Sequence, residues 1–188
     1  MTDPTKAQAC ATATPVADCG SGFIMADLMV DSLDSTPPSV SGAVAPAAPN
    51  GANGWYTGTP VVTWTVTDPE TVPLKTGCTS PFSVTTDGPQ TLTCVAVGPG
   101  GTGQASVTLK RDASAPTGIT FHGIKKKYKN GKKPRKNKVS CSATDTVSGV
   151  TSCVISGFSK KKGKHTLTAT ATNGAGLTST AKFKYKIL

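Results

Sequence analysis

The chain has 188 residues, with 20 Lys or Arg against 10 Asp or Glu, and only 5% of its residues are aromatic. Its 20 glycines and 14 prolines favour short strands and many turns over helices. No apolar run approaches the roughly 20 residues of a membrane-spanning helix, so we expect no transmembrane segment.

Residues 1–33 match no other part of the chain, and we expect them to be an irregular N-terminal remnant or the end of an upstream module. Within them, Cys10 and Cys19 are expected to close a small disulfide loop, and residues 23–33 to form one strand. After Lys6 there is no continuous apolar stretch of about 7 to 15 residues, which a signal peptide requires. Because the cysteines of the chain indicate an oxidising compartment while this segment lacks an export signal, we expect the chain to be a fragment of a longer exported protein.

Residues 34–112 and 113–188 repeat one pattern. Asp34, the first residue of the first copy, and Asp112, directly before the second copy, lie 78 positions apart. Aspartates at the end of a predicted strand, Asp68 and Asp145, lie 77 apart, and two cysteines with the same surroundings lie 75 apart. Because the offset hardly changes along the copy, the sequence predicts a duplicated unit and two domains.

Each copy is predicted to consist of five to seven short strands. In the first copy we expect strands near 40–44 and 61–68 and a hairpin over 90–110. In the second we expect a strand over 139–145 and a hairpin over 164–185. Strands of this number and length predict an all-β fold in which each copy is a two-sheet sandwich.

The hairpin over 164–185 has the clearest alternation. Leu167, Ala169 and Ala171 fall on one face and threonines on the other, which is the period of a half-buried antiparallel strand. The turn that follows, 173–176, is Asn-Gly-Ala-Gly, whose residues tolerate the positive φ of a tight turn.

Six cysteines without a Cys-x-x-Cys pair, beside only two histidines, favour disulfides over a metal site and indicate an oxidising compartment. Cys78 aligns with Cys153, whereas Cys94 and Cys141 have no counterpart in the other copy. Pairing within each copy, Cys78 with Cys94 and Cys141 with Cys153, fits this alignment and leaves Cys10 for Cys19. It remains one of 15 connectivities that six cysteines permit.

Several motifs occur together: TPP at the start, PNGANGWYTG before VTWTVTD, SGV before a cysteine, and HTLTATATNGAG before a closing strand. As a set they resemble the tandem immunoglobulin-like repeats of large secreted and surface proteins of bacteria, over residues 34–188. The resemblance implies two tandem Ig-like β-sandwiches, an extracellular or cell-surface location, and a non-enzymatic role as spacer, stalk or adhesive module. The chain departs from it in a lysine run of the second copy and in the glycine turn 98–101 of the first.

Lysine clusters distinguish the second copy, which has 16 Lys or Arg from residue 114 onward and one acid, Asp145. We expect both clusters, residues 124–138 and 159–165, to lie in loops. There they either keep loops solvated and strand edges unpaired, or attract an anionic polymer such as teichoic acid, lipopolysaccharide phosphate, an acidic glycan, extracellular DNA or anionic lipid. Tyr128 is then available to stack. The candidate binding residues are Lys125, Lys126, Lys127, Lys129, Lys132, Lys133, Arg135, Lys136, Lys160, Lys161 and Lys162. No recognition helix is present, so sequence-specific nucleic-acid binding is not expected.

Trp55 and Tyr56, in the loop that matches the first lysine cluster, have two interpretations. They form a sugar-stacking platform, or they close the end of the core, which is the commoner role of such a pair. Trp64 alternates inward and is predicted to be a core residue.

Asp68 and Asp145 directly follow predicted strands, and we expect each to accept hydrogen bonds from nearby backbone amides. Calcium between the copies is the alternative, with Asp68, Glu70 and Asp112 as the nearby acids. A calcium ion needs 6 to 8 oxygen ligands, so such a site would depend on carbonyls and water. We therefore predict no metal site and no cofactor.

Catalytic groups are scarce. His122 and His165 have no carboxylate pair, Cys-His dyad or glycine-serine elbow beside them in sequence. We expect no enzymatic activity. Two functions remain: a disulfide-linked spacer, and a module that attaches to anionic envelope or matrix polymers through its second copy.

Overall fold

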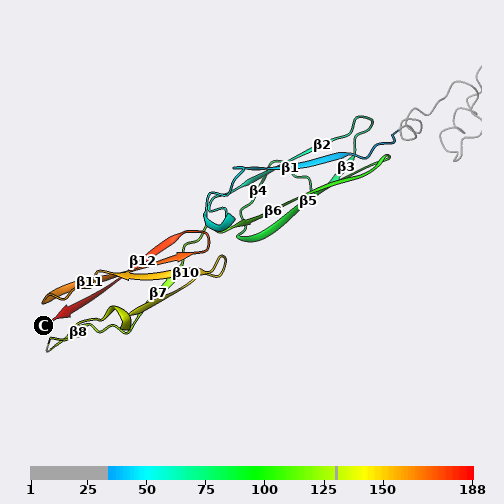
Figure 1. Ribbon diagram of the computed structural model, residues 1–188. Helices are drawn as coiled ribbons and strands as arrows, with labels where there is room; N and C mark the ends of the chain where they lie inside the picture. Colours follow the sequence, from blue (N-terminus) through cyan, green and yellow to red (C-terminus); the bar gives the residue numbers. More distant parts are fainter. Residues whose placement is uncertain (1–33, 130) are drawn as a thin grey trace, which may run out of the picture.

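The computed structural model describes residues 34–129 and 131–188, and their regular secondary structure is almost entirely β-strand, connected by turns and loops. Figure 1 shows the strands in two successive groups along one long axis, residues 39–111 in the first group and 117–187 in the second. The predicted all-β class is confirmed. Within the described residues, no helix has the length and apolar character to cross a membrane. The predicted Cys10–Cys19 bridge and the strand over 23–33 lie outside the described residues.

The first group contains two three-stranded sheets, in the orders β1-β2-β4 and β3-β5-β6. The first sheet consists of β1 (Ser39–Ala45), β2 (Val61–Thr67) and β4 (Phe82–Ser83). The second consists of β3 (Leu74–Thr76), β5 (Gly88–Gly98) and β6 (Gly101–Arg111). All pairs are antiparallel, and a short 3₁₀ turn, η1 (Ala52–Gly54), lies between β1 and β2.

The core of the first group forms because alternate residues of its strands point inward. Val62 and Trp64 of β2 are buried together with Cys94 of β5 and Leu109 of β6. Trp64 is 7% exposed, as expected for a core residue. Cys94 is bonded to Cys78, 16 positions earlier, which ties the loop after β3 to this core.

The second group contains a two-stranded sheet, β7-β9, and a four-stranded sheet in the order β10-β11-β12-β8. The smaller sheet consists of β7 (Thr117–His122) and β9 (Ser140–Thr144). The larger consists of β10 (Val150–Ser156), β11 (Gly163–Asn173), β12 (Thr178–Ile187) and β8 (Lys127–Tyr128). A second 3₁₀ turn, η2 (Lys136–Lys138), precedes β9. β8 is parallel to β12, and the other pairs are antiparallel.

The predicted hairpin of the second group is confirmed. Leu167, Ala169 and Ala171 of β11 are all fully buried, and β12 returns antiparallel beside them. Cys141 of β9 is bonded to Cys153 of β10, 12 positions later. Since β9 and β10 belong to different sheets, this disulfide links the two sheets of the group. Both described disulfides are the pairings that the alignment of the two copies indicates.

The disulfide of the second group is expected to supply a large part of its stability. Replacing both cysteines, Cys141→Ser with Cys153→Ser, removes the constraint that the disulfide places on the unfolded chain. In the chain-entropy model this constraint contributes about 3 kcal/mol to the free energy of unfolding. We expect the free energy of unfolding, measured by urea denaturation, to fall by roughly that amount. Ser152→Ala, at an exposed position next to Cys153, is the matched control and should leave it within about 0.5 kcal/mol. An unchanged urea midpoint in the double variant would contradict the prediction.

Candidate functional site

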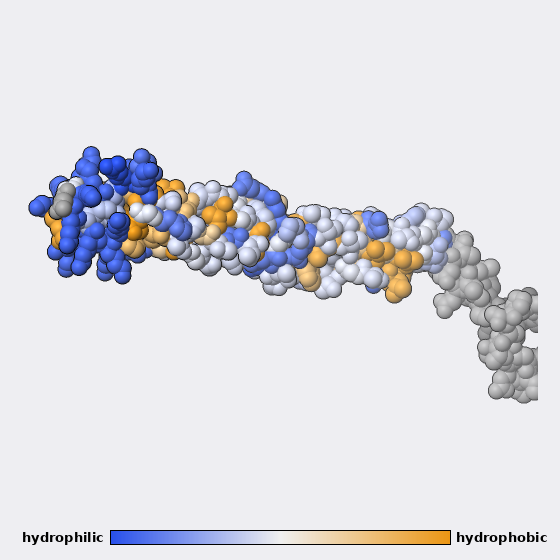
Figure 2. Space-filling view, turned by 90° about the horizontal axis from the view of Figure 1, so that it is seen from below, coloured by the Kyte–Doolittle hydropathy of each residue, from blue (hydrophilic) through white to orange (hydrophobic). Residues whose placement is uncertain are grey.

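The two lysine clusters meet at one end of the molecule. Figure 2 shows hydrophilic side chains gathered over this end, which Figure 1 identifies by β8 and the C-terminus. All eleven candidate binding residues are exposed. We call this surface, formed by Lys125–Lys127, Lys129, Lys132, Lys133, Arg135, Lys136 and Lys160–Lys162, the basic end.

Tyr185 of β12 holds the two parts of the basic end together. It is 3% exposed, and its hydroxyl accepts a hydrogen bond from the backbone N–H of Ser159 at 2.9 Å. Its ring also meets the ring of Tyr128 edge-on, with the centroids 6.1 Å apart. Because one buried side chain contacts both segments, lysine clusters that are distant in sequence form one surface.

The first lysine cluster is more ordered than the predicted loop. Lys127 and Tyr128 form β8, and Lys136 begins η2, so the expectation that the whole cluster is a loop was wrong at these residues. The cause is the pairing of β8 with the end of β12, where Lys127 lies opposite Lys186. The chain between Gly123 and Lys138 encloses a hollow of about 660 Å³ that is lined mostly by Lys and Arg.

Tyr128 lines this hollow but is only partly exposed, and its stacking role stays a prediction. Its ring is half-buried against the core of the second group, and its hydroxyl accepts a hydrogen bond from the backbone N–H of Lys125 at 3.1 Å. The ring and the hydroxyl of Tyr128 therefore both contact other parts of the protein.

Trp55 and Tyr56 are buried, at 9% and 5% exposure, so the sugar-stacking interpretation was wrong. Lys110 places its Nζ 5.1 Å from the centroid of the Trp55 ring. The Tyr56 hydroxyl donates to the carbonyl of Pro46 at 3.1 Å. Burial against the core leaves no ring face for a sugar.

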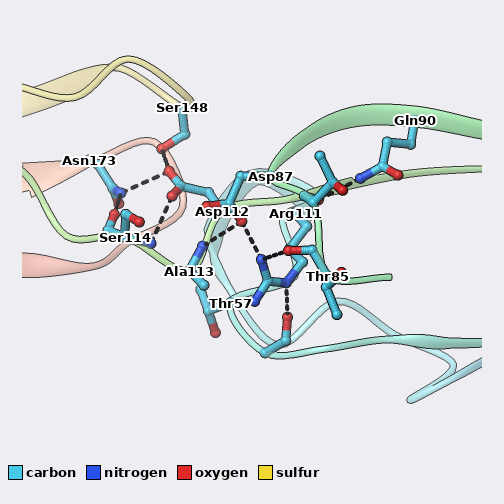
Figure 3. Close-up of polar contacts among 12 residues, drawn as sticks. Thr57, Thr85, Asp87, Gln90, Arg111, Asp112, Ala113, Ser114, Ser148 and Asn173 are labelled. Atoms are coloured by element: carbon cyan, nitrogen blue, oxygen red, sulfur yellow. Dashed lines mark hydrogen bonds and ion pairs between the residues drawn. The ribbon is translucent and has the colours of Figure 1, made fainter. Parts of the chain in front are cut away.

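A buried carboxylate lies at the junction of the two groups. Asp112 is fully buried, and its backbone N–H donates to the carbonyl of Tyr56 in the first group at 2.9 Å. Its side chain accepts hydrogen bonds from the N–H of Ser114 at 3.0 Å and from the hydroxyl of Ser148. The amide Nδ2 of Asn173 donates to the same carboxylate at 3.0 Å. Figure 3 shows these side chains converging on Asp112.

Two loops extend the junction on either side of this carboxylate. In the first group, the N–H of Ala52 donates to the carbonyl of Ala175 at 2.8 Å. The side chain of Asn53 donates to the carbonyl of Gly174 at 2.9 Å. The 3₁₀ turn η1 therefore lies directly on the turn between β11 and β12.

Arg111 fixes the connection from the side of the first group. Its guanidinium forms an ion pair with Asp87 and donates to the carbonyl of Gly58 at 2.7 Å. The carboxylate of Asp87 also accepts the N–H of Ala113 at 3.2 Å. Figure 3 shows Arg111 between these partners. The chain between the two groups is thus held by side chains as well as by backbone.

Asn173 joins two carboxylates, because its amide also donates to Asp145 at 2.9 Å. The other oxygen of Asp145 accepts three successive backbone N–H groups, those of residues 147–149, as the sequence predicts. Burial acts to raise the pKa of Asp145, but the hydrogen bonds from Asn173 and these amides outweigh it. The pKa therefore lies below its ordinary value, and the carboxylate is charged.

The first group repeats this polar arrangement at its opposite end from the junction. The hydroxyl of Thr71 donates to Asp34 at 2.6 Å, and this hydrogen bond is the main cause that lowers the pKa of Asp34. Asp68 accepts the backbone N–H groups of Glu70 and Thr71, as predicted. The residues Asp34, Asp68 and Thr71 have the roles that Asp112, Asp145 and Ser148 have in the second group.

One element of the arrangement differs between the groups. Gly98 stands where the second group has Asn173, and no donor reaches Oδ2 of Asp68, which is buried without a partner. A Cβ atom on Gly98 would lie 3.3 Å from this oxygen and 3.5 Å from Oδ2 of Asp34. The missing Asn side chain thus leaves two carboxylates without their shared donor.

Carboxylate oxygens of Asp34, Asp68 and Glu70 lie within 4.8 Å of one another, which is the one such group in ranges 34–129 and 131–188. These are oxygen donors of the kind that Ca²⁺ takes, but with one oxygen each they supply at most half of a shell of 6 to 8 ligands. Of the acids named for the calcium alternative, Asp112 belongs to the junction instead. The expected absence of a metal site stays a prediction.

The two histidines make separate contacts. Nε2 of His122 shares a hydrogen bond with the hydroxyl of Ser142 at 2.8 Å, and Nε2 of His165 donates to the carbonyl of Lys161 at 2.6 Å. The hydrogen bonds of the described residues connect neither ring to a carboxylate.

Further exposed lysines are not among the eleven candidate binding residues, because they alternate with inward-facing residues and do not form a run. Lys182, Lys184 and Lys186 alternate with inward-facing residues along β12, and all three are exposed. Lys164 is exposed on β11, opposite Lys186. The period-two pattern AKFKYKI over 181–187 is the signal that could have found them.

A scan of the chain against protein-family models gives no match, and a search of the curated proteins gives none either.

Gly98→Asn is expected to complete the polar arrangement of the first group. An amide at this position can donate to Asp34 and Asp68 as Asn173 does to their counterparts, and hydrogen bonds to charged groups contribute about 1.5–3 kcal/mol. Because the new Cβ lies only 3.3 Å from two neighbouring oxygens, we expect a net gain of about 1 kcal/mol in urea denaturation.

Gly98→Ala is the matched control for this prediction. It places the same Cβ against the carboxylates without a donor, so we expect it to lower stability. An Asn variant no more stable than the Ala variant would show that the two carboxylates do not lack a donor.

Proposed function

We propose that this chain is a non-enzymatic spacer of an exported bacterial protein, built from two Ig-like β-sandwiches joined end to end. The observation that carries the proposal is the junction, where Asp112 is bonded to both groups of strands: its backbone N–H donates to Tyr56 of the first, and its buried carboxylate accepts from Ser148 and Asn173 of the second. Bending at this point would break either the backbone hydrogen bond to Tyr56 or the hydrogen bonds to the buried carboxylate, and an unpaired buried polar group is costly. A joint of this kind keeps two bodies in line.

The repeated polar arrangement supports a duplicated unit. Asp34 bonded to Thr71 and Asp112 bonded to Ser148 are two versions of one contact. Their residues are related by the offsets of 78 and 77 positions that the sequence shows. A unit with this contact at its N-terminal side can be joined in series, which is what a spacer needs.

Two disulfides support an exported protein. They lie in separate groups of strands, and each closes a short loop of 16 or 12 positions. Bodies of this size bury only about 60% of their unfolded surface and usually need such a bond. The bonds persist in an oxidising compartment.

The basic end supports a second function, attachment to an anionic cell-envelope or matrix polymer. Eleven exposed Lys or Arg are gathered there by the contacts of Tyr185. The one salt bridge of the described residues is Arg111–Asp87, so none of these eleven is neutralised by a carboxylate within the described part of the chain. A surface of this density attracts polyanions through release of their counterions.

The spacer proposal predicts that the junction controls the shape of the chain in solution. Asn173→Ala removes the shared donor of Asp112 and Asp145, so we expect a stability loss of about 1–3 kcal/mol. We also expect a broader distribution of lengths in small-angle X-ray scattering. Asn50→Ala, whose side chain bonds within its own loop to Thr57, is the matched control and should leave the scattering profile unchanged. A parent chain that already scatters as two freely hinged bodies would contradict the proposal.

The attachment proposal predicts retention that depends on salt. The chain should bind immobilised teichoic acid, heparin or DNA at low salt and elute as salt rises. Replacing Lys132, Lys133, Arg135 and Lys136 by glutamine should reduce the slope of log affinity against log salt by up to about 0.9 for each phosphate that is no longer neutralised. Lys75→Gln in the first group is the control with no expected effect. Absence of retention at low salt would leave the spacer function alone.

A further inference from the structure

Five lysines form a continuous surface on the outer face of the four-stranded sheet. They are Lys127 of β8, Lys164 of β11, and Lys182, Lys184 and Lys186 of β12, and we call them the lysine track. In Figure 1 they belong to the β11–β12 hairpin and to β8 beside it. Lys127 is shared with the basic end, and the other four are additional to it.

Three members of the track lie side by side across three neighbouring strands. Lys186 is directly opposite Lys164 on one side and directly opposite Lys127 on the other. Side chains that are opposite each other in a sheet have their Cβ atoms about 5 Å apart, and like charges at this distance are destabilising. The free chain therefore carries an electrostatic cost at Lys186 that an anion would remove.

The remaining members run along β12. Lys182, Lys184 and Lys186 are two residues apart, which places neighbouring Cα atoms about 6.8 Å apart with their side chains on one face. Thr168 and Thr166 lie opposite Lys182 and Lys184, and they add hydroxyl donors to this face. Around Lys164, Lys184 and Lys186 the surface forms a hollow of about 400 Å³. The pattern is a line of evenly spaced cations beside hydrogen-bond donors.

Protection of a strand edge does not explain the four track lysines of β11 and β12. Lysines on edge strands keep sheets from pairing with other chains, but β11 and β12 are interior strands in the order β10-β11-β12-β8. Balance by acids does not explain them either. Asp145 is the only acid after residue 113, and it is bonded to Asn173, at the far end of β11 from Lys164 and about 30 Å away.

We propose that the lysine track binds a linear phosphodiester polymer without bases, of the polyol-phosphate class, with successive phosphates on Lys182, Lys184 and Lys186. This inference rests on the attachment function proposed above and names its ligand class. A three-carbon polyol separates neighbouring phosphorus atoms by six skeletal bonds of about 1.5 Å, so an extended chain repeats about every 7 Å. That repeat matches the spacing of the lysines along β12.

One feature favours this class over nucleic acid, and a second is compatible with phosphate binding. The aromatic residues of β12, Phe183 and Tyr185, point into the core, so the track itself offers no platform on which bases stack. The track contains lysine and no arginine. Lysine binds phosphate as a point charge, whereas arginine is preferred where a carboxylate or phosphate is held in a fixed bidentate geometry.

The test measures affinity by calorimetry for glycerol phosphate and its oligomers of increasing length, on the full chain at fixed low salt. We expect affinity to rise steeply until the oligomer spans the three lysines of β12. In Lys182→Gln/Lys184→Gln/Lys186→Gln we expect this length dependence to disappear. We also expect the slope of log affinity against log salt to fall by about 2, at 0.7 per phosphate contact.

The matched control removes the same charge from the basic end. Lys132→Gln/Lys133→Gln/Lys136→Gln should bind more weakly than the parent but keep the length dependence. Equal losses of affinity in the two triple variants would overturn the proposal that the lysine track is the binding site, since they would show that only net charge determines affinity. Tighter binding of an oligothymidylate with the same number of phosphates would overturn the ligand class. A parent chain that binds no oligomer at low salt would instead reject the attachment function itself.

An independent measurement tests the geometry without any ligand. Lys186→Gln should raise the urea midpoint of the free chain at low salt, because it relieves repulsion from Lys164 and Lys127, and the gain should vanish at high salt. Lys182→Gln is the control, since Thr168 is its neighbour on β11. If both variants behave alike at low salt, the lysines do not repel one another as the track requires.

Discussion

The pairing of one buried charge is the constraint on which the arrangement of this chain depends. Asp112 has no exposed surface, and a carboxylate in that position has to be matched by donors. Its donors come from the chain that follows it and from two distant turns, at Ser148 and Asn173. Its own N–H meanwhile binds the first group. The two groups of strands are placed relative to each other because this one residue has partners in both.

Charge is distributed unevenly along the length of the molecule. The paired acids, Asp34 and Asp112, lie at the N-terminal side of each group and are held by local donors. The lysines gather at the end of the second group that is far from the junction, whereas Asp145, the only acid in the sequence after residue 113, lies near the junction. Repulsion among them is tolerated because disulfides and a buried core hold the sheet. An unbalanced end of this kind is available to an external anion.

Local patterns allowed many elements to be predicted. The alternation of Leu167, Ala169 and Ala171 specified both the strand and its buried face, because side chains of a strand point to opposite sides in turn. The hydrogen bonds of Asp68 and Asp145 followed from the short range over which such turns close. Burial of Trp55 and Tyr56 was left open, because a loop residue is buried or exposed according to what packs against it.

The sequence by itself determined that the chain is β-structure, where its hairpins lie, and that positive charge belongs to its C-terminal part, since these depend on period and composition. Tertiary structure alone decided that Tyr185 brings two lysine clusters together and that β8 adds to β12 in parallel, placing Lys127 beside Lys186. It also decided that Asn173 is shared by two aspartates. These contacts join residues far apart in sequence, and no local pattern encodes which distant partner a side chain meets.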